Sequence, residues 1–296
     1  MTILVTGASG LIGFRLCNKL AAEGAGVVAL TSNSRRASVL RPSSSIRVVG
    51  CDIRDHDGLN QILGTYQFDT VFHLAAHLPS TPDPDFVRVN AMGTANLLNT
   101  CYRTGVKNFI YASSMSVYST PPVLLPVDEM HPTIPDSVYG KTKLTGERLC
   151  KHYSWLMRAV TIRFSSVFGP GDNSRVTYCF TQAALSNQAI QVDGDGSQSS
   201  DFIYVDDAVQ GAILAMEHGR SGGVYNIGSG RETSVLKLAY LAAGLVDPHV
   251  EVRLSGRLAT RPFRFVADIE KARRELGYSP SDLVEGMKKY REEMKG

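Results

Sequence analysis

The fold of this chain follows from its first thirteen residues, Met1-Thr-Ile-Leu-Val-Thr-Gly7-Ala-Ser-Gly10-Leu-Ile-Gly13. The apolar run before Gly7 predicts a buried strand, and the apolar residues after Gly13 recur at helical intervals. A glycine turn between a strand and a helix is the setting of a phosphate-binding site, although the glycines alone equally fit a plain turn. We expect Gly7 to take a backbone angle closed to other residues, Gly10 to let a pyrophosphate approach its N–H, and Gly13 to let the helix lie close to the strand.

Composition and charge are those of an ordinary soluble globular protein. Hydrophobic residues make up 43% and charged residues 20% of the 296 residues. The net charge of +3 is too small to indicate a nucleic acid or a membrane surface as a partner. A strand that starts at residue 2 leaves no room for a signal peptide, so we expect a cytoplasmic location. The five scattered cysteines lack metal-ligand spacing, which predicts free thiols and no metal site.

Strands alternate with helices through the first half of the chain. This order predicts right-handed crossovers and a parallel sheet covered on both faces, an α/β fold of the Rossmann-like doubly wound class. In such a sheet the ligand lies across the carboxyl ends of the strands. After the first strand, the predicted strands are Val27–Leu30, Ile46–Gly50, Thr70–Leu74, Asn108–Ala112 and Ala159–Phe164, and the clearest helix is Asp85–Thr104.

The residues after the second strand select the cofactor. A carboxylate there would bind the adenosine ribose and select NAD. This chain instead has Leu30-Thr-Ser32-Asn-Ser-Arg35-Arg36, which contains no acid. Hydroxyl and guanidinium groups suit a 2′-phosphate, because arginine binds phosphate in fork geometry with full charge. We therefore favour NADP(H) over NAD(H); the alternative is that Arg35 and Arg36 only open a solvated helix.

Residues at the ends of the third and fourth strands complete the predicted cofactor site. Asp52 could accept a hydrogen bond from the adenine amino group, or it could cap the following helix. Ala75 and Ala76 are small enough for a cofactor to pass over the backbone. His73, which apolar residues flank, is expected to be a hydrogen-bonded core histidine and not a catalyst. The predicted cofactor contacts are Gly7, Ser9, Gly10, Leu11, Ile12, Gly13, Ser32, Arg35, Arg36, Asp52, Ile53, Leu74, Ala75, Ala76, Asn90, Tyr139 and Lys143.

A hydroxyl cluster and a Tyr-x-x-x-Lys pair carry the predicted chemistry. Ser114 stands at the carboxyl end of the fifth strand, and Tyr139 and Lys143 are four residues apart on one helix face. A phenol is a poor base, with a pKa of about 10, but a nearby ammonium favours the phenolate. Tyr139 could then take a proton from a sugar hydroxyl while hydride leaves the same carbon, and Ser114 would hold the oxygen.

The glycine turn, the hydroxyl cluster and the Tyr-x-x-x-Lys pair follow one another along the chain. In this order they resemble the motifs of the extended short-chain dehydrogenases/reductases, the sugar-nucleotide epimerases, dehydratases and ketoreductases. The resemblance implies a tyrosine-dependent hydride-transfer enzyme with Ser114, Tyr139 and Lys143 as catalytic residues. It also implies a dinucleotide-binding Rossmann domain, residues 1–165, and a smaller α/β carboxyl-terminal substrate lobe, mainly residues 166–296, interleaved with the Rossmann core. The motifs that carry it are Thr6–Gly13, Val71–Ala76, Ser113-Ser114, Tyr139–Lys143, Arg163–Pro170, Gly194–Asp207 and Tyr225–Gly230.

The resemblance also implies which residues contact the substrate. Ser116, Tyr118 and Ser166 are predicted substrate contacts, and Arg261 best matches the arginine that relatives place on a diphosphate. Ser166 and Ser200 stand where the family commonly has Asn and Arg, so we expect an altered sugar pocket and one altered phosphate contact. In this half of the chain the predicted helices are Val176–Asn187, Val205–Glu217 and two within Asp268–Lys295.

Several functions compete within this resemblance. Met115 and Ser116 follow Ser114, where 4,6-dehydratases carry an Asp-Glu pair, which argues against a dehydratase. We favour a C4 ketoreductase of nucleotide-diphosphate sugars that uses NADPH, because Arg35 and Arg36 suit its phosphate. The alternative is a 4-epimerase, similar to UDP-glucose 4-epimerases, that retains NAD. A reductase of a non-sugar aldehyde or ketone, or a non-catalytic dinucleotide sensor, fits less well. A homodimer through Asp85–Thr104 and Ser137–His152 is a further expectation from the family.

Overall fold

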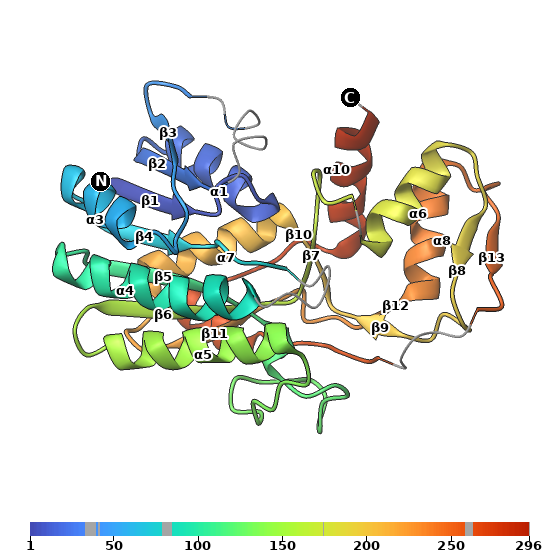
Figure 1. Ribbon diagram of the computed structural model, residues 1–296. Helices are drawn as coiled ribbons and strands as arrows, with labels where there is room; N and C mark the ends of the chain where they lie inside the picture. Colours follow the sequence, from blue (N-terminus) through green and yellow to red (C-terminus); the bar gives the residue numbers. More distant parts are fainter. Residues whose placement is uncertain (33–39, 41, 79–84, 174, 258–262, 296) are drawn as a thin grey trace.

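A seven-stranded parallel sheet forms the centre of the described chain (Figure 1). The computed structural model describes residues 1–32, 40, 42–78, 85–173, 175–257 and 263–295. The strand order reverses beside the first strand, which confirms the predicted doubly wound Rossmann-like fold. Across the sheet, the strands are β11 (Val224–Ile227), β6 (Arg158–Phe164), β5 (Asn108–Ser114), β4 (Thr70–His73), β1 (Thr2–Thr6), β2 (Gly26–Thr31) and β3 (Ile46–Gly50).

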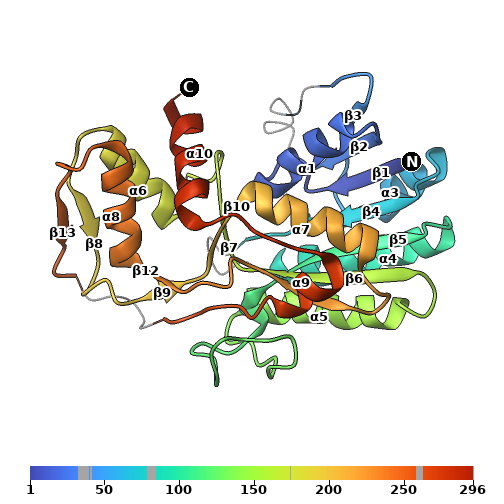
Figure 2. The ribbon, with the colours of Figure 1, turned by 180° about the vertical axis from the view of Figure 1, so that it is seen from behind.

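Helices bury both faces of this sheet, because alternate residues of each strand point to opposite sides. In β1, Ile3 and Val5 join one buried cluster and Leu4 joins the other. The first face packs against α1 (Leu11–Ala22), α7 (Val205–His218) and α9 (Glu270–Leu276). The second face packs against α3 (His56–Thr65), α4 (Thr94–Arg103) and α5 (Val138–Tyr153) (Figures 1 and 2).

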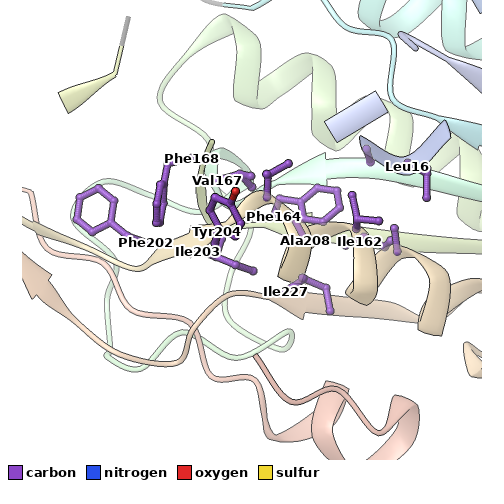
Figure 3. Close-up of a cluster of buried hydrophobic side chains, with 14 of the residues drawn as sticks. Leu16, Ile162, Phe164, Val167, Phe168, Phe202, Ile203, Tyr204, Ala208 and Ile227 are labelled. Carbon is purple, nitrogen blue, oxygen red and sulfur yellow. The ribbon is translucent and has the colours of Figure 1, made fainter. Parts of the chain in front are cut away.

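The larger core cluster continues from the sheet into the second half of the chain (Figure 3). Ile162 and Phe164 of β6 lie with Ala208 of α7 and with the short parallel pair β7 (Ser166–Phe168) and β10 (Phe202–Tyr204). Because one continuous apolar cluster joins the two halves, the second half of the chain packs directly on the sheet.

Helices α6 (Val176–Leu185), α8 (Val235–Val246) and α10 (Leu283–Lys295) stand beyond the carboxyl ends of the central strands (Figure 1). They pack with two small sheets at the far end of the molecule. These sheets pair β8 (Ile190–Val192) with β13 (Val252–Leu254) in parallel and β9 (Ser199–Ser200) with β12 (Thr233–Ser234) in antiparallel fashion.

One strand was not predicted, and several predicted elements have other bounds in the structure. The seventh strand, β11, was not predicted; it is four residues long and joins the sheet beside β6 from far along the chain. The predicted helix Asp85–Thr104 begins with a π-helical segment, η1 (Val87–Gly93), before α4. Strand β5 runs on to Ser114, because it pairs with β6 along its whole length. Within the described ranges, the helices lack the length and apolar character needed to cross a membrane.

Candidate active site

The glycine turn after β1 lines a cleft that runs along the carboxyl ends of the central strands. Gly7 has a φ of 68°, and a Cβ on it would lie 2.6 Å from the Ala75 nitrogen. A Cβ on Gly13 would overlap the Gly7 carbonyl, so both predicted roles are confirmed. The Gly10 N–H donates to the Gly7 oxygen at 3.0 Å, and the approach of a pyrophosphate to Gly10 stays a prediction. Helix α1 has no capping side chain, which leaves the first-turn N–H groups of Leu11 and Ile12 for an anion.

The adenosine end of the cleft contains a cation that the sequence analysis missed. Arg54 donates to the Asp52 carboxylate from Nε to Oδ1 at 3.0 Å and from Nη2 to Oδ2 at 2.9 Å. This pairing lowers the pKa of Asp52. Asp52 does not cap the next helix; Asp55 does, accepting from the Gly58 N–H at 3.0 Å. The spacing Asp-x-Arg after a strand was the available signal for this pair. Ser32 is exposed at the cleft, and Arg35 and Arg36 lie outside the described residues.

Side chains beneath the fourth strand hold its end in place. His73 is fully buried, its Nδ1 lies 2.8 Å from Thr6 Oγ1 and its Nε2 lies 2.8 Å from Thr94 Oγ1. Burial lowers the pKa of His73 to about 3, as expected of a neutral core histidine. Asn90 is buried away from the cleft and hydrogen-bonds both backbone groups of His77. Asn90 therefore supports the loop after β4, and its predicted cofactor contact stays a prediction.

The predicted catalytic side chains meet because α5 lies very close to β5. A Cβ on Gly140 would overlap the Ser116 carbonyl, and one on Gly146 would overlap the Tyr111 hydroxyl. The two glycines thus allow the helix to approach. Lys143 donates from Nζ to the Ala112 carbonyl at 2.7 Å, and this nitrogen lies 5.9 Å from the centre of the Tyr139 ring.

Burial shifts the pKa of both Tyr139 and Lys143. Burial raises the pKa of Tyr139, and a hydrogen bond with Ser114 and the charge of Arg175 oppose that rise. Burial lowers the pKa of Lys143 to about 8. Ser114 is held in turn, because its Oγ accepts from the Ser116 N–H and donates to the Ser116 Oγ, both at 3.1 Å.

The other predicted substrate contacts do not all lie on the cleft. Ser166 lines the cleft, and its Oγ lies 2.7 Å from the Ser200 Oγ, so the two residues that depart from the family pattern form one pair. Tyr118 is buried off the cleft, and its hydroxyl is engaged with Asn226 at 3.0 Å and with the Asp128 carbonyl at 2.9 Å. Arg261 lies outside the described residues.

Two further features of the substrate end were not predicted. Arg175, which precedes α6 and is paired with Asp172, lines the cleft near Tyr139. Phe263 and Phe265 stack with an interplanar angle of 6° and give the cleft an aromatic wall. The alternation Phe-x-Phe was visible in the sequence, but nothing in it placed these residues beside β9.

One cleft of about 1220 Å³ collects these residues. It runs from the glycine turn past the catalytic side chains to β7, and it is larger than a second cavity of about 430 Å³ beside β2 and β3. The chemistry of its lining fits a dinucleotide: open helix N–H groups for phosphates, small residues beneath, and hydroxyl groups at the reacting end. Of the predicted residues, it is lined by Gly7, Ser9, Gly10, Leu11, Ile12, Gly13, Ser32, Asp52, Ile53, Leu74, Ala75, Ala76, Ser114, Ser116, Tyr139, Lys143 and Ser166.

Comparisons with known proteins agree with this geometry. The model of the NAD dependent epimerase/dehydratase family matches residues 3–228. A UDP-glucose 4-epimerase of Mycolicibacterium smegmatis is 34% identical over 98% of this chain and 97% of its own length. The structure of a UDP-glucose 4-epimerase from Thermotoga maritima with UDP-glucose has a TM-score of 0.89 and 28% identity, covering 100% of this chain and 99% of the other. That of a UDP-glucuronic acid 4-epimerase from Bacillus cereus, in complex with UDP-glucuronic acid and NAD, has a TM-score of 0.87 and 30% identity with the same coverage.

Proposed function

Because the chain belongs to the NAD dependent epimerase/dehydratase family and is an NAD(P)-dependent enzyme of the short-chain dehydrogenase/reductase type, we propose that it is a 4-epimerase of UDP-sugars that retains NAD. The sequence favoured a C4 ketoreductase with NADPH, and the relatives support its alternative instead. Similar proteins with full-length coverage are named as UDP-sugar 4-epimerases, and one similar structure is a complex with NAD. The argument for NADPH rested on Arg35 and Arg36, which lie outside the described residues.

The observation that carries the proposal is a proton-transfer group, Tyr139, at the reacting end of the cleft. Tyr139 stands there with Ser114 and Lys143, and the dehydratase acid–base pair is replaced by Met115 and Ser116. A 4-epimerase needs one group that removes a proton from the C4 hydroxyl and later returns it to the C4 oxygen. NAD bound along the cleft would supply the acceptor and donor of hydride.

The catalytic residues divide this work. Tyr139 takes the proton, and the Ser114 hydroxyl, which donates to the Ser116 Oγ in the structure, would turn its hydrogen toward the C4 oxygen and hold it. Lys143 stabilises the phenolate through its charge, since its ammonium lies close to the ring. Because the sugar must turn before the proton is returned, the pocket has to hold the nucleotide firmly and the sugar loosely. The paired Ser166 and Ser200, which are short and uncharged, suit that loose end.

We assign the remaining predicted residues to the two ligands. The N–H groups of Leu11 and Ile12 bind the dinucleotide phosphates, and Asp52 with Arg54 borders the adenosine. Ser116 contacts the sugar, and Arg261 contacts the diphosphate. Tyr118 and Asn90 act from behind the cleft wall, since their polar groups are already bonded.

The test starts with the purified protein. We expect denaturation to release NAD, identified by mass, in about equal amount to the protein, and UDP-glucose or UDP-galactose to be converted into a mixture of both. Tyr139→Phe should lower turnover at least about a hundredfold while NAD remains bound. Tyr66→Phe is the matched control, because the Tyr66 hydroxyl contacts Arg47 away from the cleft.

Three other outcomes would contradict the proposal. An empty protein that oxidises NADPH with a UDP-4-keto-sugar would support the ketoreductase. Loss of carbon dioxide from UDP-glucuronic acid would indicate a decarboxylase. Unchanged turnover in Tyr139→Phe would exclude the assigned mechanism.

A further inference from the structure

A buried ion pair lies directly behind the catalytic residues. Glu147 follows Lys143 by one helical turn on the same face of α5, as Lys143 follows Tyr139. Arg163 of β6 donates to Glu147 from Nε at 2.9 Å and from Nη2 at 2.7 Å, in fork geometry. Both side chains are nearly inaccessible, with exposures of 7% for Glu147 and 6% for Arg163. Neither is part of the proton transfer described above.

The pair is tied to the end of the strand that presents Ser114. Ser113, the neighbouring residue, donates from Oγ to Glu147 Oε1 at 2.5 Å. On its other side, Arg163 donates from Nη1 to the Tyr118 hydroxyl at 2.6 Å, just after the η2 turn (Met115–Val117) that Ser114 caps. One hydrogen-bonded chain therefore connects α5, the end of β5 and the turn that follows.

Stability alone is a poor explanation for this pair. Removing two charges from water costs free energy that their attraction often does not recover, and apolar residues of equal volume commonly serve a core as well. What a forked, charge-assisted contact adds is direction. Apolar contacts between α5 and β5 leave room for small sliding movements, whereas the Ser113–Glu147–Arg163 chain fixes one register.

We propose that Glu147, Arg163 and Ser113 are positioning residues, which hold the Tyr139 and Lys143 side of α5 in register with Ser114. This inference rests on the proposed proton transfer, since it assigns these residues to the same site. They act through the catalytic residues: Glu147 and Arg163 lie outside the cleft lining, and Ser113 borders the cleft with its hydroxyl bonded to Glu147. Loss of the link should therefore lengthen the Tyr139–Ser114 hydrogen bond and slow proton transfer, with little effect on substrate binding.

The test uses a mild variant, because breaking the ion pair itself leaves a buried charge and can prevent folding. Ser113→Ala removes the link to the strand and keeps both charges. Ser281→Ala is its matched control, since the Ser281 Oγ donates to Asp207 at 2.6 Å outside the cleft. We expect Ser113→Ala to lower kcat about tenfold with KM within about twofold, and Ser281→Ala to change neither.

A second readout needs no substrate. In protein labelled with carbon-13 at the tyrosine Cζ, the Tyr139 signal, identified by its loss in Tyr139→Phe, reports the hydrogen bond to its hydroxyl. We expect this signal to move in Ser113→Ala and to stay in place in Ser281→Ala. If the signal moves although wild-type protein turns over no UDP-sugar, the positioning role stands and the proposed function fails. If the Tyr139 signal is the same in both alanine variants, the positioning role is overturned.

Discussion

At the scale of one residue, the buried ammonium of Lys143 lowers the stability of the folded protein. This ammonium is buried and donates a hydrogen bond to the Ala112 carbonyl. Tyr139, Cys150 and Glu147 on the same helix, and Tyr111 and His73 from the sheet, are the titratable groups around it. Burial lowers the pKa of Lys143 from 10.5 to about 8, so the folded protein gives up this proton more easily than the unfolded chain.

The sign of the resulting pH dependence follows from linkage. Between pH 8 and 10.5 the unfolded chain binds more protons at Lys143 than the folded protein, so stability rises with pH in this window. In dinucleotide-free protein, we expect the unfolding free energy of wild type to gain on that of Lys143→Met by up to about 3 kcal/mol between pH 7 and pH 10.5. Denaturant unfolding at several pH values measures this difference. Parallel pH profiles for the two proteins would mean that Lys143 is not desolvated.

The sequence predicted the residues whose chemistry depends on type and order, and it missed those placed by tertiary contacts. Ser114, Tyr139 and Lys143 were predicted together, and the structure brings them to one cleft; their catalytic role remains a proposal. Tyr118 was predicted on the cleft because its neighbours are there, but Asn226, from far along the chain, holds it in the core. Contacts between residues so distant in sequence leave no local pattern.

At the scale of elements, the glycines were the most informative residues. Gly13 lets α1 approach the turn, and Gly140 and Gly146 let α5 approach β5. Only the first was predicted, because Gly140 and Gly146 lie inside a helix, where a glycine gives no indication of what packs against it. Strand β11 was missed because it enters the sheet from the second half of the chain, outside the alternation of strands and helices that predicted the others.

Two Gly→Ala substitutions distinguish the effect of close packing on stability from the effect of helix propensity. In Gly13→Ala the added methyl overlaps the Gly7 carbonyl, so we expect a loss of about 1–3 kcal/mol in stability and weaker NAD retention. In Gly64→Ala of helix α3 the methyl meets no atom within 4 Å, so we expect a gain of up to about 1 kcal/mol. Thermal unfolding and dinucleotide content measure both effects. Equal stabilities for the two variants would mean that α1 does not pack on the turn as described.

At the scale of the whole molecule, the helices on the face of the sheet opposite α1 and α7 carry exposed apolar side chains that the proposed site does not explain. Met92 of η1, Tyr102 of α4 and Val138 of α5 are 58%, 48% and 55% exposed, and they lie on the elements that the sequence predicted as a dimer interface. Exposed apolar side chains gathered on neighbouring helices are typical of protein–protein interfaces. They support the prediction of a homodimer, which has not been tested.

A pair of tyrosine substitutions tests this prediction. Tyr102→Glu places a charge on the predicted interface, so we expect it to convert a dimer into a monomer at micromolar concentration, because a buried unpaired charge opposes association. Tyr240→Glu places the same charge on α8, where Tyr240 is 60% exposed and far from this face, and should leave the dimer intact. Light scattering coupled to gel filtration measures the masses. A monomeric wild type, or identical masses for both variants and wild type, would contradict an interface on α4 and α5. Since α5 carries Tyr139 and Lys143, a dimer formed there would also brace the helix on which the proposed chemistry depends.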